Sequence, residues 1–356
     1  LAEICKHIVM HYNDGWANGF HYEIRYWEIW NEPDYIQFWL GTPQEYFRLY
    51  DTVARALKTV DPNIKVGGPA LAWNQTFLGT FLRFCRANDS PLDFVSWHIY
   101  PERPPYSVAE TAQQIQDLLL TYGFESAENF LTEWNFAFVS GSMPAINWNA
   151  TGAAWASSVL VYLQDTSILR AFMYASTSTD GQFDKTANSF VAMRNMLQSP
   201  IRLACNGSDN VGFATLAGRS ENGSNLTVLV SDFNGEYDEF LLNVNDLPWQ
   251  ERIVVVRIYL SDETHDMALV ERSERMLSGS LVFRHKINPS SVYLISVQAK
   301  EPSMETTAHS ETTSATTPLG FFGQSLLLPV SAILGVVSVA VISYVSKKRA
   351  KHRETS

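Results

Sequence analysis

Two short stretches of the chain bring together residue types that can cleave a glycosidic bond. Glu32 lies in WEIWNEPD and Glu133 in LTEWN, each beside Trp and Asn, about 100 residues apart. Cleaving a glycosidic bond takes two carboxyl groups, because one protonates the leaving oxygen while the other attacks the sugar or stabilises its cation. A lone glutamate is usually a solvated surface group, whereas two glutamates in such similar contexts predict a paired-carboxylate site.

The region around both glutamates alternates short apolar strands with amphipathic helices, which is typical of parallel βα units. Five units are predicted, with strands at 26–31, 64–67, 94–98, 130–132 and 168–174 and helices at 42–60, 77–87, 108–122, 152–164 and 186–197. Functional groups gather at the carboxyl ends of such strands. Glu32 and Glu133 follow two of them, and His98 and Tyr100 end the strand between, so we expect these four side chains to meet. Trp30, Trp97 and Trp134 lie beside them and offer flat faces for pyranose C–H groups.

A closed (β/α)₈ barrel has eight units and roughly 250 residues. We therefore expect an α/β fold, a (β/α)₈ TIM barrel lacking about its first three βα units, in preference to an open five-stranded sheet. The chain begins at Leu1 within a predicted helix, which favours an amino-terminal truncation. Residues 1–204 form this partial barrel in our interpretation, and the short alternating strands of residues 205–300 predict a β-sandwich.

The carboxyl-terminal part predicts a membrane anchor. Residues 301–324 read as a Ser/Thr-rich stalk, residues 325–346 as a transmembrane helix, and residues 347–356 as a basic cytoplasmic tail. The apolar run 326–345 has the length needed to cross ~30 Å of hydrocarbon, and the basic tail after it predicts a single-pass type I topology with the catalytic domain extracellular or luminal. A buried helix of a soluble protein is the alternative. Six N-x-Ser/Thr sequons precede the apolar run, which fits an extracellular or luminal location for that part of the chain: Asn74, Asn88, Asn149, Asn206, Asn222 and Asn225.

Charge and cysteine usage narrow the class of partner. The net charge is −11 with no basic stripe, which argues against a nucleic-acid partner. Cys5, Cys85 and Cys205 show no CxxC spacing, so no zinc site is predicted. The paired-carboxylate mechanism also requires neither a metal nor a cofactor.

Four stretches together are similar to glycoside hydrolase family 39: RYWEIWNEPD, PQEYFRLYDTVARALKTVDPNIKVGGPA, PLDFVSWHIYP and LTEWN, in that order over residues 20 to about 140. This resemblance implies cleavage with retention of configuration, with Glu32 as acid/base and Glu133 as nucleophile. It also implies that Asn31 hydrogen-bonds the sugar 2-hydroxyl and that His98 and Tyr100 orient the nucleophile and the sugar. Further substrate contacts are expected from Trp30, Trp134 and Tyr174, the last standing where xylosidase-like members carry a Trp.

The resemblance favours an exo-acting, β-xylosidase-like enzyme with a carbohydrate substrate. The sister activity, α-L-iduronide cleavage, needs a cation for the substrate carboxylate, and Arg103 is the one strand-end candidate in the barrel segment. A membrane-anchored, non-catalytic carbohydrate-binding ectodomain is a further alternative, disfavoured by the intact glutamate motifs. Because the first barrel units are expected to complete the sugar pocket, we expect this chain alone to be inactive or unfolded.

Overall fold

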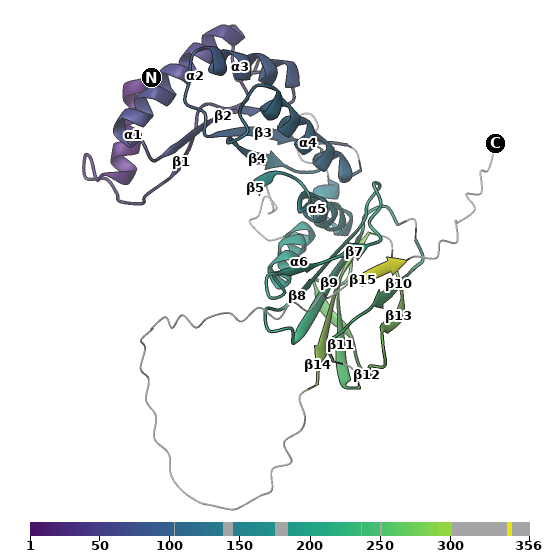
Figure 1. Cartoon of the computed structure of the whole chain (residues 1–356). Helices are drawn as coiled ribbons and strands as arrows, with labels where there is room; N and C mark the ends of the chain where they lie inside the picture. The colour runs from purple at the N-terminus through teal and green to yellow at the C-terminus, as the bar shows by residue number, and fades with distance from the viewer. Residues whose placement is uncertain are drawn as a thin grey trace, which may run out of the picture.

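The computed structural model describes residues 1–300 except 103, 138–144, 175–183, 236, 250 and 289, together with the backbone of residues 340–343. The first two hundred residues form an α/β fold (Figure 1). Five strands pair in chain order and all in parallel: β1 (Tyr26–Glu28), β2 (Lys65–Leu71), β3 (Phe94–Ile99), β4 (Glu128–Trp134) and β5 (Ile168–Met173). They make a parallel half-barrel, so the predicted α/β class and all five predicted strands are confirmed.

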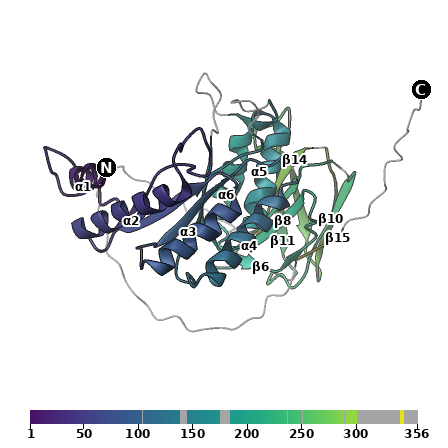
Figure 2. The ribbon, with the colours of Figure 1, turned by 90° about the horizontal axis from the view of Figure 1, so that it is seen from above.

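Six helices accompany these strands: α1 (Ala2–Asn13), α2 (Pro43–Val60), α3 (Gln75–Ala87), α4 (Tyr106–Thr121), α5 (Ala150–Leu163) and α6 (Asn188–Met196). Two short 3₁₀ helices, η1 (Ala145–Trp148) and η2 (Lys185–Ala187), precede α5 and α6. Figure 2 shows α2, α3 and α4 side by side along one face of the parallel sheet. The predicted start of α2 is confirmed, because Thr42 and Glu45 form a capping box and Pro43 occupies the first turn.

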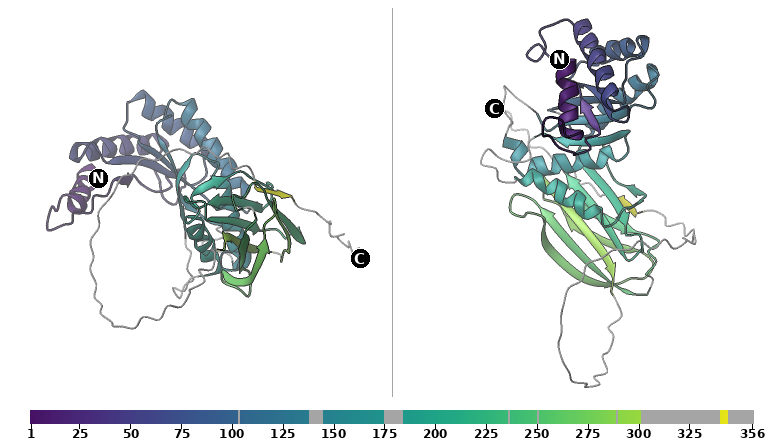
Figure 3. Two further views of the ribbon diagram at one scale, coloured as in Figure 1. Left: turned by 60° about the horizontal axis from the view of Figure 1, so that its bottom comes forward. Right: turned by 90° about the vertical axis from the view of Figure 1, so that its left-hand side faces the viewer.

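Helix α5 joins the half-barrel to the rest of the molecule. Almost all of its residues are buried, because it lies between the parallel sheet and a second sheet (Figures 1 and 3). Its abundance of Ala, Gly and Ser lets both sheets approach closely, and a helix apolar on all sides is typical of such a central position. Two buried serines fix the contact: Ser158 Oγ donates to Gly212 O (2.8 Å), and Ser231 Oγ donates to Ala154 O (2.7 Å).

The region after α6 consists of two β-sheets that share one hydrophobic core. The six-stranded sheet has the order β12-β11-β14-β9-β8-β6 and the four-stranded sheet the order β13-β10-β15-β7. The strands are β6 (Ile201–Leu203), β7 (Cys205–Asn206), β8 (Phe213–Arg219), β9 (Asn225–Asp232), β10 (Glu239–Val244), β11 (Ile253–Ser261), β12 (Ala268–Met276), β13 (Leu281–Lys286), β14 (Ser291–Ala299) and β15 (Ala340–Ser343). Strand β12 lies at an edge of the six-stranded sheet and is rich in charged residues.

The predicted transmembrane run, 326–345, contributes one described element. Residues 340–343 form β15, which pairs antiparallel with β10 and parallel with β7, so a strand replaces the predicted helix there. Pairing along β10 satisfies backbone groups that an open sheet edge leaves exposed, which is the physical reason a Val/Ile-rich segment is favoured at that place. The rest of this run and the predicted stalk lie outside the described residues. Within the described part of the chain, no helix is both long and apolar enough to cross a bilayer.

Candidate active site

Glu32 is held at the carboxyl edge of the half-barrel by its own backbone. Its N–H donates to Ala70 O (3.0 Å), which ties the loop after β1 to the end of β2. Both Trp30 (φ 75°) and Glu32 (φ 47°) adopt left-handed conformations, which are costly for residues other than glycine. Such conformations persist only where surrounding contacts enforce them, so the fold fixes the position of Glu32.

Asp34 supplies much of that enforcement, and the sequence analysis did not single it out. Its carboxylate accepts hydrogen bonds from three successive backbone N–H groups at the start of α3, those of Ala72 (2.9 Å), Trp73 (3.0 Å) and Asn74 (2.9 Å). These bonds lock the loop after β1 against the loop after β2. In the sequence, the sign of this role was the position of Asp34 at the end of WNEPD, directly after Pro33.

His98 and Glu133 are register partners on the neighbouring strands β3 and β4. His98 Nδ1 lies 2.7 Å from Glu32 Oε1 and 3.6 Å from Glu133 Oε2, and the imidazole is 1 % exposed. The ligand-type atoms of Glu32, His98 and Glu133 all lie within 4.8 Å of one another. The structure therefore brings the two predicted carboxylates together, with the histidine between them and closest to Glu32.

Tyr100 approaches the pair from the other side. Its hydroxyl donates a hydrogen bond to Glu133 Oε2 (2.7 Å). Burial, followed by this hydrogen bond and the Glu133 charge, raises the pKa of Tyr100 well above its ordinary value, so the phenol remains a donor throughout the neutral range. The ring of Tyr174, directly after β5, makes an edge contact with Tyr100 at 6.1 Å and is 46 % exposed. Tyr174 therefore borders the site, as predicted for a substrate contact.

Asn135 connects the ends of β4 and β5 and was another residue that sequence reasoning passed over. It is buried, its Nδ2 donates to Tyr174 O (2.8 Å), and its N–H donates to Ile99 O (3.3 Å). Through these bonds it fixes the loops that carry Glu133 and Tyr174. In the sequence, the sign of this role was that the polar Asn135 directly follows Trp134, the last residue of the apolar strand in LTEWN.

The expected role of two tryptophans is corrected. Trp134 is completely buried and packs against Trp155 in the hydrophobic core. Trp97 is equally buried, and its Nε1 donates to Asn129 Oδ1 (2.8 Å). Alternation along a strand sends neighbouring side chains to opposite faces. Each tryptophan therefore points into the core while its neighbour, His98 or Glu133, points toward the site, and neither tryptophan offers a face to a sugar.

The remaining predicted substrate residues lie on the loop after β1. Trp30 is 40 % exposed, its Nε1 donates to Phe38 O (3.2 Å), and its ring contacts Trp39 edge-on. Asn31 is half-buried directly before Glu32.

Arg103, the cation considered for an iduronide carboxylate, lies outside the described residues.

The predicted glycosylation asparagines are spread over both regions. Asn74 and Asn88 flank α3, Asn149 caps the start of α5, and Asn206 lies in β7. Asn222 lies in the turn between β8 and β9, and Asn225 begins β9. The sequon asparagines at the ends of α3 and α5 thus serve as helix caps in the fold.

The geometry suits a direct attack on sugar better than an attack by water. A pair of carboxyl groups ~5–5.5 Å apart leaves room for a covalent glycosyl intermediate, whereas an inverting pair lies ~6.5–9.5 Å apart to admit water. Ligand-type oxygens of Glu32 and Glu133 lie within 4.8 Å of each other, which is shorter than the separation of an inverting pair. With His98 the same residues are also of the types that bind divalent metals, although here His98 shares a hydrogen bond with Glu32 and Glu133 accepts one from Tyr100.

Comparison with known proteins agrees with this arrangement. The model of the family described as "Glycosyl hydrolases family 39" matches residues 2–200. A β-xylosidase of Geobacillus stearothermophilus is 32 % identical over 159 residues, covering 39 % of this chain and 31 % of that protein. A β-xylosidase of Caldicellulosiruptor saccharolyticus is 36 % identical over 117 residues, covering 32 % of this chain and 22 % of that protein.

A solved structure extends the likeness beyond the half-barrel. The structure of a glucosidase from Croceicoccus marinus superposes with a TM-score of 0.73 at 25 % identity, covering 83 % of this chain and 73 % of that one. Parallel strands with paired glutamates at their carboxyl ends define the class as that of the barrel-type glycosidases. The chain belongs to glycosyl hydrolase family 39. It matches less than a third of the length of the two β-xylosidases.

Proposed function

We propose that the protein is a retaining, exo-acting glycosidase for β-xylosides. The observation that carries this proposal is that ligand-type oxygens of Glu32 and Glu133 lie within 4.8 Å of each other at the carboxyl ends of β1 and β4, two strands of one parallel sheet. Family membership adds support, as does the similarity to two proteins described as β-xylosidases.

In this proposal the two glutamates act in turn. Glu133 attacks the anomeric carbon while Glu32 gives its proton to the leaving oxygen, which yields a glycosyl ester on Glu133 and releases the alcohol. Glu32, now a carboxylate, takes a proton from water, and the resulting hydroxide equivalent attacks the same carbon and frees Glu133. Tyr100 holds Glu133 Oε2 by its hydrogen bond, which leaves the second carboxylate oxygen for the attack.

A panel of nitrophenyl glycosides tests the reaction and its sugar. The full-length protein is expected to hydrolyse the β-xyloside faster than the β-glucoside, with α-L-iduronide the poorest substrate. Preference for the α-L-iduronide would replace the substrate assignment with the sister activity of the family. Sugar binding by a folded protein without any hydrolysis would instead support a non-catalytic binding ectodomain.

Replacing Tyr100 by Phe is expected to lower kcat/KM for the preferred glycoside about 10- to 100-fold, because a hydrogen bond to a charged group contributes about 1.5–3 kcal/mol. The ring and its contact with Tyr174 are retained, so the thermal midpoint should change little. Tyr259→Phe is the matched control, since it removes a hydroxyl from a half-buried ring on β11 in the β-rich region. Wild-type kinetics in Tyr100→Phe would contradict the assigned positioning role.

We further propose the location predicted from the sequence: a single-pass type I membrane protein with a stalk over residues 301–324 and its glycosidase region facing the lumen or the outside. The apolar run 326–345 and the basic tail after it support this topology. It requires residues 340–343 to leave their pairing with β10 and β7 and to join the membrane-spanning helix. The β-rich region of residues 205–300 would then be a β-sandwich domain between the half-barrel and the stalk. Glycan occupancy at the sequons of the full-length protein, expressed without an added signal peptide, would test the luminal placement.

A further inference from the structure

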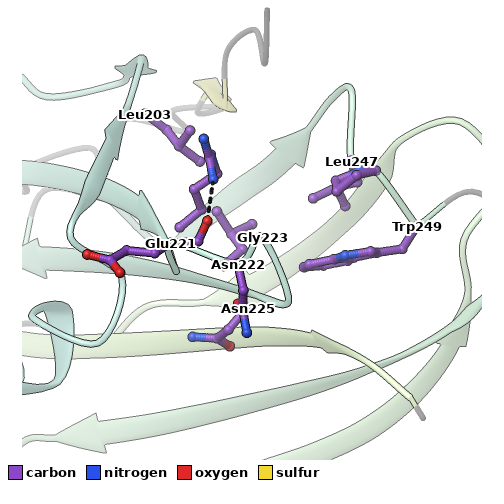
Figure 4. A pocket seen from close by; sticks show the side chains of 10 residues that line it. Leu203, Glu221, Asn222, Gly223, Asn225, Leu247 and Trp249 are labelled. Atoms are coloured by element: carbon purple, nitrogen blue, oxygen red, sulfur yellow. Dashed lines mark hydrogen bonds between the residues drawn. The ribbon is translucent and has the colours of Figure 1, made fainter. Parts of the chain in front are cut away.

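A cavity of about 310 Å³ opens in the β-rich region, beside the turn that joins β8 to β9. One wall is apolar and consists of Leu247, Pro248 and Trp249, while Asn222 and Asn225 lie across from it (Figure 4). Ligand pockets combine an apolar lining with a few polar groups, and this volume is near the lower end of their range. The cavity therefore suits one small amphipathic group, such as a single sugar ring.

Both asparagines across from Trp249 belong to sequons, but their surroundings differ. Asn225 Nδ2 donates to Ser199 Oγ and to Thr227 Oγ1 (3.1 Å each), and its Oδ1 accepts from Ser296 Oγ (3.0 Å). A glycan on Asn225 would have to replace donor bonds of that nitrogen inside the sheet. The fold therefore disfavours a glycan on Asn225.

In Asn222 the side-chain oxygen, and not the nitrogen, makes the described hydrogen bonds. The residue is exposed in the β8–β9 turn, and its described hydrogen bonds all go to Oδ1, from Ser220 Oγ (2.8 Å) and from Ser224 N and Oγ (3.0 and 2.8 Å). Gly223 (φ 69°) gives the turn its left-handed residue, with no other atoms within 4 Å of the place of a Cβ. Nδ2, the atom that would carry a sugar, is thus available in an open turn.

We propose that Asn222 is N-glycosylated and that the first N-acetylglucosamine of this glycan occupies the cavity against Trp249. Asn222 Nδ2 would displace the diphosphate from C1 of a lipid-linked oligosaccharide and lose one proton, forming the C–N bond. The C–H face and the acetamido methyl of the sugar suit the apolar wall. A tether at the cavity rim raises the effective concentration of the sugar. This inference rests on the proposed luminal location and is independent of the glycosidase reaction.

Peptide mass spectrometry gives the first test. The full chain, made behind a signal peptide in secretory cells that produce high-mannose glycans, is expected to carry a glycan at Asn222 and none at Asn225. Hydrolysis of the nitrophenyl panel is recorded on the same sample, so that a failure here is separable from a failure of the proposed reaction. An unmodified Asn222, with or without glycans at other sequons, would overturn the proposal.

Thermal unfolding gives the second test. Trimming with an endoglycosidase that leaves one N-acetylglucosamine should not lower Tm, whereas trimmed Asn222→Gln should melt about 2–4 °C below the trimmed wild type, the shift expected for a modest stabilisation of a domain of this size. In unglycosylated protein from bacteria the same substitution measures only the loss of the turn hydrogen bonds to Asn222 Oδ1. The Tm shift in the trimmed protein should exceed this shift by about 2–4 °C, which separates the sugar from the turn. Asn206→Gln, at an exposed sequon on β7, is the matched control and should not lower the Tm of the trimmed protein.

The role of the cavity is tested by Trp249→Phe, which should reduce the Tm difference between trimmed wild type and trimmed Asn222→Gln. If Trp249→Phe does not fold, the comparison of trimmed wild type with trimmed Asn222→Gln still tests the proposal. Equal Tm for trimmed wild type and trimmed Asn222→Gln would overturn the proposal.

Discussion

Replacing Glu133 by Gln should lower kcat/KM for the preferred glycoside about 10⁴-fold or more, because an enzyme that loses its nucleophile retains only the catalysis that binding and positioning provide. Glutamine has nearly the same shape, and its amide oxygen can still accept the hydrogen bond that Tyr100 donates to Glu133 Oε2 in the wild type. It cannot attack the anomeric carbon. Steady-state hydrolysis of nitrophenyl glycosides measures the loss, and thermal unfolding checks that the fold is intact.

Glu110→Gln is the matched control for this prediction. Glu110 lies on helix α4 and its side chain is exposed, so the same chemical change there should leave activity unchanged. Azide supplies a second check, since a small anion can occupy the space left in Glu133→Ala and form a glycosyl azide of inverted configuration. Wild-type turnover by Glu133→Gln would refute the nucleophile assignment and, with it, the double displacement.

The half-barrel was predictable because its signals are local. Five apolar runs separated by amphipathic helices define the strands, and the Thr42–Glu45 capping box marks the start of α2 within one residue. Strand ends then place the chemistry: His98 and Glu133, distant in sequence, became predicted neighbours once β3 and β4 were taken as adjacent and parallel. The meeting of Glu32, His98, Tyr100 and Glu133 follows from topology alone.

Side-chain direction was harder to predict than position. Trp134 follows Glu133 and was expected to face the sugar, but alternation along β4 sends it to the core. His98 was expected to orient the nucleophile, yet its Nδ1 is closer to Glu32. The register shift between Trp97 and His98 changes which neighbour each side chain meets, and no sequence pattern at that place signals it.

The supporting residues were missed for a different reason. Asp34 and Asn135 act through backbone atoms of distant loops, at Ala72–Asn74 and at Tyr174. A sequence shows which residue can donate or accept, but the partner appears only when two loops are brought together. Similarly, the run 326–345 reads as a helix from hydropathy alone, while pairing of residues 340–343 with β10 depends on an open sheet edge elsewhere in the chain.

Replacing Glu32 by Gln should give a loss that depends on the leaving group, and this dependence separates its role from that of Glu133. On an alkyl xyloside, whose leaving oxygen needs a proton, we expect kcat/KM to fall about 10²–10⁴-fold, the usual contribution of a positioned general acid. On a dinitrophenyl xyloside the leaving group needs little protonation, so kcat/KM should fall far less.

Azide should then speed turnover of Glu32→Gln and give a glycosyl azide of retained configuration, because the Glu133 intermediate still forms. Glu133→Gln is the matched variant, since it should be equally slow with both leaving groups. An equal loss on both substrates in Glu32→Gln would mean that Glu32 is not the acid, and its hydrogen bond to His98 would then be its main contribution.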